Sequence, residues 1–356
     1  MTADEQYMFR CLELAQKGAG DVAPNPLVGS ILVHEGRIIG EGYHKAYGGP
    51  HAEVECLASV AESDRQFISS STLYVSLEPC SHQGKTPPCA DMIIRERIPV
   101  VVIGCGDPFP LVNGSGIGKL DAAGILVKQH VLEADAIMLN KRFFTFHQQQ
   151  RPYIILKWAQ TLNGMIAGEG KERLQISNSF TNQLVHQWRS AESAILIGTE
   201  TALIDNPRLT SRIPGGRNPV RLVIDRELRL PKSLHIFDAT AQTIIFNTRH
   251  EERLGNLYYC RLEECNDLLP GLLNKLYSLG IQSVLVEGGK KIHESFIHAG
   301  LWDEIRMISS SDTYTQQGYQ APALPDIQWF KTDHLQTDRI DYFQKPAIME
   351  GLGRIS

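Results

Sequence analysis

The sequence predicts an α/β protein that is divided into two domains, and three observations support this. The chain has 356 residues, which is more than one ordinary hydrophobic core holds and suits two domains of roughly 150–200 residues. Segments of strand character alternate with segments of helical periodicity, which is typical of a layered α/β sheet. A polar stretch at residues 147–150 precedes Pro152. Because proline disfavours helix before it, we predict domains at 1–147 and 151–356.

The first half begins with a helix, because Met8, Cys11, Leu12 and Ala15 recur at helical spacing. In chain order we predict a helix over 4–18, strands over 27–33 and 37–41, a helix from 51, a strand over 73–76, a helix from about 89, a strand over 100–103, a helix over 117–123, a strand over 125–128 and a helix over 132–146. The alternation indicates one layered sheet.

The alternation restarts after Pro152 and predicts a second α/β domain. Its expected strands cover 153–158, 194–197, 220–224, 243–246 and 283–286, and its expected helices cover 180–190, 268–279 and 291–299. Residues 309–325 are rich in Ser, Thr, Gln and Gly, so we expect a loop there. A last pair of strands is expected near 327–330 and 339–343.

Composition favours a cytoplasmic enzyme that acts on a small molecule. Hydrophobic residues make up 42% and charged residues 21% of the chain, and no run of about 18 apolar residues suits a membrane span. The first ten residues lack the basic and then apolar order of a signal peptide. A net charge of −5 argues against a nucleic-acid binder, whose surface is expected to be basic.

The seven cysteines do not suggest a disulfide framework, since their number is odd and no export signal is evident. Cys80 and Cys89 are therefore available as thiolate ligands. We expect the other five cysteines to be small buried hydrophobic residues: Cys11, Cys56, Cys105, Cys260 and Cys265.

One histidine and two cysteines form a predicted catalytic zinc site. His51 follows Gly-Gly-Pro, Cys80 follows Leu-Glu-Pro, and Cys89 follows Pro-Pro. A catalytic zinc ion takes about three protein ligands and one water. Each ligand cluster lies where a loop enters a helix, and the helix dipole there favours thiolates. Glu53 lies in the same helical turn as His51, within reach of the open position, and is predicted to transfer protons. The pattern matches the His-x-Glu and Pro-Cys signature of zinc nucleobase deaminases.

A closed, purely structural zinc site is the alternative, and it requires a fourth ligand. His82 or Cys56 could supply one. A closed site has no open position for water, so it would give Glu53 no catalytic role. The glycine-rich run at 114–119 fails the spacing of a phosphate-binding loop, so we interpret it as a turn before a helix.

The first half resembles the cytidine-deaminase-like superfamily, and within it the pyrimidine deaminase of riboflavin biosynthesis. Most members of the superfamily place the two cysteines as Pro-Cys-x-x-Cys, whereas eight residues separate Cys80 from Cys89 here. Further matches are residues 24–29 (PNPLVG), 40–44 (GEGYH) and 107–114. The resemblance implies a three-layer fold. It also implies substrate contacts at Asn25, His44, His82, Lys85 and Thr86. Phe109 departs from the family, which usually has asparagine there.

The second half resembles the reductase that is often fused to this deaminase. The matching segments are residues 157–164 (KWAQTLNG), Trp188-Arg189, the stretch from Gly198 to Arg212, Val223-Ile224-Asp225 and Val286-Glu287-Gly288-Gly289. The resemblance implies a dihydrofolate-reductase-like fold that uses NADPH, in families that usually self-associate as dimers or tetramers.

The physical pattern agrees with a dinucleotide site. Gly288 and Gly289 end a buried strand and open a helix, where backbone amides can approach a pyrophosphate. The resemblance implies cofactor contacts at Gln160, Gln175, Thr201, Asp205 and Gly289. It implies substrate contacts at Arg189, Leu209, Arg212 and Glu287, of which the two arginines suit forked contacts with a phosphate.

Four departures from the reductase family predict altered pockets. Arg173 stands where a small polar residue is usual, Gln175 replaces an aromatic residue, and Arg226 replaces a serine. The continuation at residues 307–310 (MISS) also differs from the usual apolar segment.

The leading hypothesis is a bifunctional zinc- and NADPH-dependent enzyme of riboflavin biosynthesis. It would deaminate 2,5-diamino-6-(5-phosphoribosylamino)pyrimidin-4(3H)-one and then reduce the ribosyl chain. The alternatives are a nucleoside, nucleotide or tRNA-base deaminase with an unrelated or degenerate second domain, and a zinc-stapled binding protein without turnover. The acidic net charge disfavours the tRNA reading.

Overall fold

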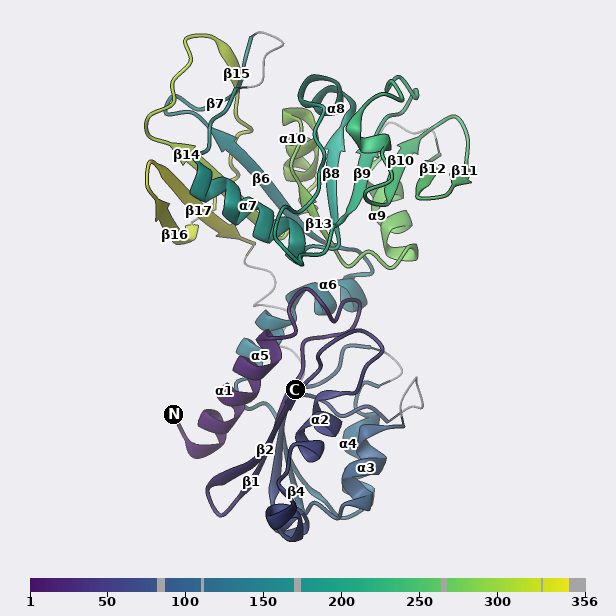
Figure 1. Cartoon of the computed structure of the whole chain (residues 1–356), viewed down its shortest axis with the longest axis vertical. Helices are drawn as coiled ribbons and strands as arrows, with labels where there is room; N and C mark the ends of the chain where they lie inside the picture. The colour runs from purple at the N-terminus through teal and green to yellow at the C-terminus, as the bar shows by residue number, and fades with distance from the viewer. Residues whose placement is uncertain (82–86, 110–111, 170–173, 264–267, 328, 346–356) are drawn as a thin grey trace. The chain divides into compact units, whose positions relative to one another are not determined.

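The computed structural model describes residues 1–81, 87–109, 112–169, 174–263, 268–327 and 329–345. The predicted substrate residues His82, Lys85 and Thr86, the departure at Arg173 and the thiol of Cys265 lie outside the described residues. The chain divides into two compact units, Met1–Gln150 and Arg151–Ser356, and Figure 1 shows the elements of each.

The first unit has a five-stranded sheet in the order β2-β1-β3-β4-β5. Strand β1 is antiparallel to β2 and β3, whereas β3, β4 and β5 run parallel. The elements are α1 (Ala3–Gln16), β1 (Gly29–His34), β2 (Arg37–Tyr43), α2 (Ala52–Ala58), the 3₁₀ helix η1 (Glu62–Ser70), β3 (Thr72–Leu77), α3 (Cys89–Arg95), β4 (Val100–Cys105), α4 (Ser115–Ala122), β5 (Leu126–Lys128), α5 (Glu133–Leu139) and α6 (Lys141–Gln149).

Helices cover both faces of this sheet, which confirms the predicted three-layer arrangement (Figure 1). Alternate residues of β1 point to opposite faces: Ile31 packs with α1, and Leu32 packs with the cluster that holds α2, α3 and α4. The glycines of β1 and β2 permit close packing. A Cβ on Gly29 would lie 2.0 Å from the Cys11 carbonyl oxygen on α1, and one on Gly42 would lie 2.2 Å from the Cys56 nitrogen on α2.

The helix predicted over 132–146 is wrong in one respect, because it is two helices that meet at Asn140. The Asn140 side chain accepts a hydrogen bond from the Leu27 nitrogen at 2.7 Å and donates one to the Leu27 oxygen at 2.9 Å. The buried amide thus pairs with backbone from another part of the chain. The same pairing coincides with the later start of β1, at Gly29 rather than at residue 27.

The second unit has a ten-stranded sheet in the order β11-β12-β10-β9-β8-β13-β6-β14-β17-β16. Its strands run parallel from β12 to β14, and antiparallel strands flank them on both sides. The strands are β6 (Tyr153–Gln160), β8 (Ala194–Gly198), β9 (Val220–Ile224), β10 (Thr243–Asn247), β11 (Glu252–Leu254), β12 (Leu257–Arg261), β13 (Ser283–Val286), β14 (Glu304–Ser310), β16 (Trp329–Leu335) and β17 (Asp338–Gln344).

Two hydrophobic clusters cover the two faces of this larger sheet. One contains buried leucines of α9 (Leu269–Ser278) and Phe296 of α10 (Lys290–His298). The other contains Val185 and Trp188 of α7 (Ser179–Ala191) and Ala202 of α8 (Thr199–Asp205). All five strands predicted over 153–286 are present, and the last predicted pair corresponds to β16 and β17.

The loop predicted over 309–325 is partly wrong, because it contains β15 (Gly318–Gln320). This strand pairs with β7 (Met165–Gly168) in a separate two-stranded sheet. A Cβ on Gly318 would lie 2.2 Å from the Ala167 carbonyl oxygen. The strand therefore depends on a partner about 150 residues earlier, which local composition does not show.

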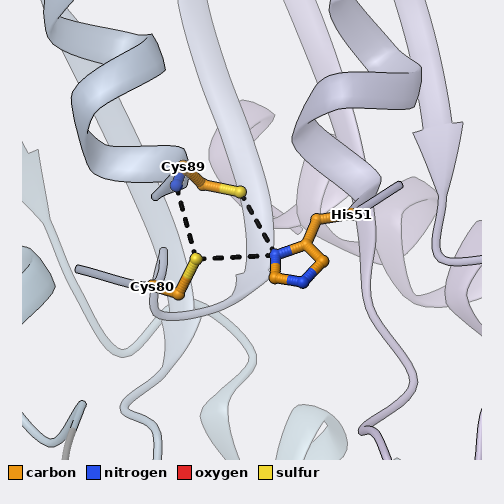
Figure 2. A group of neighbouring side chains, drawn as sticks. All are labelled: His51, Cys80 and Cys89. Atoms are coloured by element: carbon orange, nitrogen blue, oxygen red, sulfur yellow. Dashed lines mark hydrogen bonds between the residues drawn. The ribbon is translucent and has the colours of Figure 1, made fainter. Parts of the chain in front are cut away.

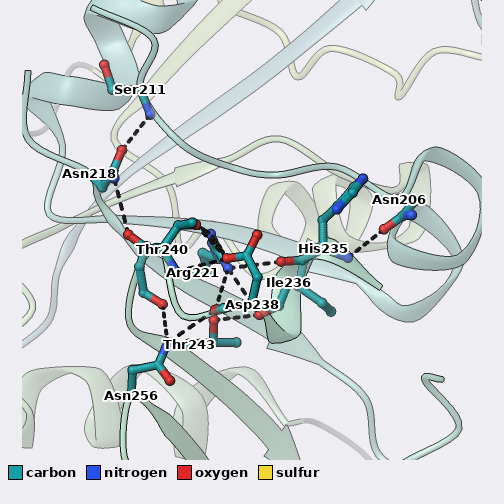
Figure 3. Close-up of polar contacts among 11 residues, drawn as sticks. Asn206, Ser211, Asn218, Arg221, His235, Ile236, Asp238, Thr240, Thr243 and Asn256 are labelled. Atoms are coloured by element: carbon teal, nitrogen blue, oxygen red, sulfur yellow. Dashed lines mark hydrogen bonds and ion pairs between the residues drawn. The ribbon is translucent and has the colours of Figure 1, made fainter. Parts of the chain in front are cut away.

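Arg221 of β9 is fully buried and anchors the chain that follows η2 (His235–Phe237), as Figure 3 shows. Its guanidinium donates to the carbonyls of His235 and Ile236 at 3.1 and 3.2 Å and to the Asp238 carboxylate at 2.8 Å. It also bonds the Thr240 hydroxyl. One buried cation thus satisfies backbone oxygens of a segment that has little regular structure of its own.

Candidate active sites

His51, Cys80 and Cys89 converge, as Figure 2 shows, and Cys80 lies in the loop that follows β3. Their ligand atoms lie within 4.8 Å of one another. His51 Nδ1 is 3.5 Å from Cys80 Sγ and 3.3 Å from Cys89 Sγ. Tetrahedral zinc with bonds of about 2.0 Å to nitrogen and 2.3 Å to sulfur spaces such ligands by about 3.6 Å. The donor set and its spacing therefore fit zinc, and the imidazole presents Nδ1.

Helix starts and direct hydrogen bonds position these ligands. His51 is the N-cap residue of α2, and Cys89 is the first residue of α3. Backbone N–H groups of Cys89 and Ala90 donate to the sulfur and the carbonyl oxygen of Cys80, at 3.3 and 3.1 Å. A hydrogen bond with the Cys89 thiol is the main cause that lowers the pKa of Cys80, and the same contact raises the pKa of Cys89. Before a metal binds, the pair therefore holds its negative charge on Cys80, as the thiolate that binds a metal.

Glu53 is buried in the first turn of α2, with 3% of its surface exposed. Burial is the main cause that raises its pKa to about 7, and the neighbouring Cys80 charge adds to it. A carboxyl group with this pKa can both accept and donate a proton near neutral pH. Glu53 is not part of the three-residue ligand cluster.

The closed-site alternative gains no support from Cys56, which belongs to the hydrophobic core between α2 and the sheet. Burial raises the pKa of Cys56 to about 12, so its thiol stays protonated. Cys11, Cys105 and Cys260 are also buried free thiols, as predicted. The other alternative ligand, His82, lies outside the described residues.

Glu78 organises the site although the sequence analysis assigned it no role. Its carboxylate accepts hydrogen bonds from the nitrogens of Gly114 and Gly116 at 3.0 and 2.9 Å, and longer ones from Asp107 and Ile117. A Cβ on Gly116 would lie 2.0 Å from the Pro79 oxygen. The run at 114–119 is thus a turn into α4, as predicted, and it binds the residue that precedes Pro79-Cys80.

Asn25 and His44 are joined by a hydrogen bond of 3.0 Å from the asparagine amide to His44 Nε2. His44 Nδ1 lies 2.8 Å from the Pro50 carbonyl oxygen, so this nitrogen carries the proton. His44 has 3% of its surface exposed. His44 thus links Asn25 to the backbone oxygen of Pro50, the residue before His51.

Phe109, the departure from the deaminase family, contacts the ring of His147 on α6 at a centroid distance of 5.1 Å. Its backbone nitrogen donates to Asp107 at 2.8 Å. Burial raises the pKa of Asp107 to about 7. The aromatic replacement therefore packs against α6.

The second site contains a buried ion pair between two predicted substrate residues, Arg189 of α7 and Glu287 after β13. Arg189 Nε and Nη2 donate to the two carboxylate oxygens at 2.8 and 2.6 Å. Burial alone would raise the pKa of Glu287, but the Arg189 charge outweighs it and lowers the pKa to about 2. Glu287 is therefore ionised, and its two carboxylate oxygens take up two of the hydrogen-bond donors of the Arg189 guanidinium.

The glycine pair after β13 lies directly against α8. A Cβ on Gly288 would lie 2.8 Å from Thr201 Cγ2, and one on Gly289 would lie 3.5 Å from Thr201 Oγ1. Gly289 has φ +87° and is the N-cap residue of α10. Two predicted cofactor residues, Thr201 and Gly289, thus face each other at the start of a helix.

The remaining predicted residues occupy different settings. Gln160 accepts from the Trp158 indole at 3.1 Å and donates to Ser309 at 3.2 Å. Leu209 is buried with φ +51°, whereas Gln175, Asp205 and Arg212 are exposed. Among the departures, Arg226 is exposed after β9, and residues 307–310 still complete β14.

Comparisons with known proteins agree with this division of the chain. Residues 1–105 match the cytidine and deoxycytidylate deaminase zinc-binding region, and residues 152–311 match the RibD C-terminal domain. The riboflavin biosynthesis protein RibD of Aquifex aeolicus is 41% identical over 309 residues, 85% of each chain. That of Bacillus amyloliquefaciens is 40% identical over 350 residues, 95% of this chain and 93% of the relative.

Solved structures match over nearly the whole chain. A Thermotoga maritima protein is 36% identical with a TM-score of 0.85, covering 96% of this chain and 98% of that one. It is described as a diaminohydroxyphosphoribosylaminopyrimidine deaminase/5-amino-6-(5-phosphoribosylamino)uracil reductase. RibD of Acinetobacter baumannii is 30% identical, with a TM-score of 0.87 and the same coverage.

Fold, metal cluster and comparisons together define a two-domain enzyme in which a zinc-dependent deaminase is fused to an NADPH-dependent reductase. The chain belongs to the family of the bifunctional riboflavin biosynthesis protein RibD. No helix of the described part of the chain is long and apolar enough to cross a membrane.

Proposed function

We propose that this chain catalyses two consecutive reactions on one pyrimidine intermediate of riboflavin biosynthesis. The first half removes an amine from 2,5-diamino-6-(5-phosphoribosylamino)pyrimidin-4(3H)-one, and the second half reduces the ribosyl chain to a ribityl chain. The juxtaposition of Glu53 with the His51, Cys80 and Cys89 cluster carries the first assignment. The Thermotoga maritima protein, named for both activities, supports the pair.

In the deaminase half, His51, Cys80 and Cys89 would hold zinc, which lowers the pKa of a bound water toward 7. Glu53 accepts a proton from the attacking water and delivers it to the departing amine. Water oxygen bonds to the ring carbon, the carbon–nitrogen bond breaks, and ammonia leaves. Burial of Glu53 supports this role because it holds the pKa near neutrality.

Asn25 orients the pyrimidine in this proposal. Because its amide nitrogen donates to His44, its oxygen is directed to accept from the substrate. His44 then acts by fixing Asn25. His82, Lys85 and Thr86 are assigned to the substrate on the family resemblance alone.

In the reductase half, bound NADPH would supply a hydride to C1 of the opened ribose, and a proton from solvent would complete the reduction. The amide of Gly289 at the start of α10 would hold the pyrophosphate, because glycine has no Cβ to block a close approach. Thr201, Asp205, Gln160 and Gln175 complete the cofactor contacts. The Glu287 carboxylate, held by Arg189, would accept hydrogen bonds from sugar hydroxyls. Leu209 is assigned as a further substrate contact, and Arg212 would bind the phosphate.

The two activities are assigned to residues 1–147 and 151–356. We also infer a cytoplasmic enzyme that assembles as a dimer or tetramer. The six described cysteines are free thiols, which supports a reducing compartment. Light scattering after size-exclusion chromatography measures the assembly, and a monomeric mass would contradict it.

The decisive experiment incubates the enzyme with the diaminopyrimidine ribosyl phosphate, with and without NADPH. Ammonia release and the 340 nm absorbance are followed separately. We expect ammonia in both arms and loss of absorbance only with NADPH. Cytidine and deoxycytidylate serve as competing substrates, and ammonia from these alone would favour a nucleoside or nucleotide deaminase. Ammonia without NADPH oxidation would indicate a degenerate reductase.

A further inference from the structure

Glu78 is the group that caps helix α4, although it belongs to the segment after β3. The N-cap residue of α4 is Gly114, which offers no side chain. The first four N–H groups of a helix have no partner inside it. Glu78 Oε1 accepts from the nitrogens of Gly116 and Ile117 at 2.9 and 3.3 Å, and Oε2 accepts from that of Gly114 at 3.0 Å. A carboxylate from another segment thus satisfies three of these four donors.

Backbone amides alone balance the Glu78 carboxylate. Glu78 has 4% of its surface exposed, and it forms no ion pair within the part of the chain that the structure describes. A fourth amide, that of Asp107, donates to Oε2 at 3.3 Å. Burial of a carboxylate is costly without such partners, and hydrogen bonds to an ionised group are stronger than those between neutral groups. The position of Glu78 relative to α4 is therefore closely fixed.

The backbone between Glu78 and Cys80 packs on the same turn of α4. A Cβ on Gly116 would lie 2.0 Å from the Pro79 carbonyl oxygen and 3.1 Å from Glu78 Oε1, so only glycine fits there. A Cβ on Gly118, two residues later on α4, would have no atom within 4 Å. The close contact is thus confined to one turn of the helix and to the two residues that precede a zinc ligand.

This contact and the start of α3 hold different sides of Cys80. The Cys89 and Ala90 nitrogens bond Cys80 and fix its distance from the other thiol. Glu78 and Pro79 fix the chain that leads from β3 to Cys80. Cys80 Sγ lies 3.5 Å from His51 Nδ1 on α2, and zinc bonds are only about 2.0–2.3 Å long. A shift of about 1 Å in Pro79-Cys80 would therefore change the geometry of the ligand set.

We propose that Glu78 is a positioning residue of the deaminase reaction, which together with Gly116 sets the place of the Cys80 thiolate against the first turn of α4. This inference rests on the proposed function of the first half. Glu78 acts through Cys80 rather than by proton transfer, because four backbone amides occupy its carboxylate oxygens.

The first test changes the contact without altering a polar group. The methyl group of Gly116→Ala must displace Pro79 or α4, and a displacement of about 1 Å can lower a rate by about a hundredfold. We expect the variant to bind zinc, to release ammonia about 10–100-fold more slowly, and to oxidise NADPH with the deaminated intermediate at the wild-type rate. Gly118→Ala, on the same helix, is the matched control and should equal wild type in all three assays. Ammonia release at the wild-type rate by Gly116→Ala would overturn the inference.

The second test removes the charge of Glu78 and keeps its shape. In Glu78→Gln one oxygen becomes an amide that cannot accept from the backbone N–H groups, so kcat or zinc affinity should fall by about 10–100-fold. The visible spectrum of the Co²⁺-substituted enzyme reports the geometry of the thiolate ligands without any substrate. Its bands should shift in Glu78→Gln and Gly116→Ala and stay in place in Gly118→Ala. Bands identical to those of wild type in both variants would refute the positioning role.

The third test needs no variant to fold. Cd²⁺ binds the same ligands at longer distances than zinc, so replacing zinc by Cd²⁺ in the wild-type enzyme moves Cys80. We expect faster hydrogen exchange, measured by NMR, at the amides of Gly116 and Ile117, and unchanged exchange at those of Ala123 and Gly124 after the end of α4. Equal exchange at all four amides in the two metal forms would contradict the inference. If wild type releases no ammonia from the diaminopyrimidine, the proposed function fails, and the cobalt spectra and exchange rates still decide the role of Glu78.

Discussion

Glu53 and Cys80 illustrate how single residues acquire their chemistry from burial and from close neighbours. A glutamate and a cysteine are common residues without special reactivity of their own. Here the fold buries the Glu53 carboxyl group beside the sulfurs of Cys80 and Cys89. Glu53 and His51 belong to the start of α2, Cys89 to the start of α3, and Cys80 to the loop after β3. The functions of metal binding and proton transfer are therefore separable by substitution.

Glu53→Gln should retain zinc and lose deaminase activity between about a hundredfold and ten-thousandfold, since an amide cannot shuttle the proton. Metal content by mass spectrometry and ammonia release measure the two effects. Glu55→Gln, two residues further on the same helix and paired with Lys45, is the control and should stay active. Loss of zinc from Glu53→Gln would show that Glu53 has a structural role instead.

His293 predicts a pH dependence of stability in the second unit. It is fully buried, and burial lowers its pKa to about 4, from an ordinary 6.5. Below pH 6.5 the unfolded chain binds a proton that the folded chain refuses, so this stabilisation is complete above pH 6.5 and is lost as the pH falls toward 4. Between pH 7.5 and pH 5 the loss should be about 2 kcal/mol.

Urea unfolding of wild type, His293→Leu and His298→Leu at both pH values isolates this effect. The buried variant should lose less stability on acidification than wild type, and the exposed variant should match wild type. Equal pH dependence in all three proteins would mean that His293 titrates normally in the folded state. His293→Leu also removes the hydrogen bond to the Val286 oxygen, so only the change between pH values is compared.

At the scale of elements, the buried Arg221 holds the chain around η2 in place. Its hydrogen bonds take the role that helix or strand hydrogen bonds have elsewhere. Arg221→Met should destabilise the second unit by about 3 kcal/mol or more, because several carbonyls and a carboxylate lose their donor. Asp238→Asn should cost only about 1 kcal/mol, because the Asp238 side chain is 30% exposed. Denaturant titration monitored by tryptophan fluorescence measures both. Equal losses would show that the ion pair, rather than the carbonyl contacts, dominates.

The sequence was sufficient for elements whose signal is local. Runs such as residues 153–156 and 284–286 are apolar because both faces of the parallel strands are covered, and this local signal predicts both strands. The break at Asn140 was missed, since helical periodicity continues through it and the reason lies in Leu27. β15 was missed because its partner β7 is distant in the chain.

The same distinction applies to the sites. The three zinc ligands could be predicted because each stands inside a short motif, and His51 and Cys89 also stand at helix starts. The pairing of Arg189 with Glu287 could not, because 98 residues separate them and only the sheet brings them together. The only sequence feature that points to the role of Glu78 is the pair of glycines at 114 and 116. Glycine allows the backbone to curve around a carboxylate and donate to it.

For the whole molecule, the two units have separate hydrophobic clusters and separate ligands. We therefore expect two thermal transitions by calorimetry. Chelation of zinc should lower the transition of the first unit and leave the second unchanged. NADPH at a hundredfold excess over Kd should stabilise the second unit by about 2.7 kcal/mol. A single transition that responds to both treatments would show that the units unfold together.

The direct bonds between Cys80 and the start of α3 have a consequence for how such enzymes diverge. Because the Cys89 and Ala90 nitrogens hold Cys80 themselves, the connecting residues 81–88 are not needed to set the spacing of the thiolates. Insertions or deletions in that segment can then accumulate over evolution without dismantling the metal centre. If His82, Lys85 and Thr86 contact the substrate as proposed, grafting this segment should change substrate preference and leave the zinc ligands and Glu53 in place.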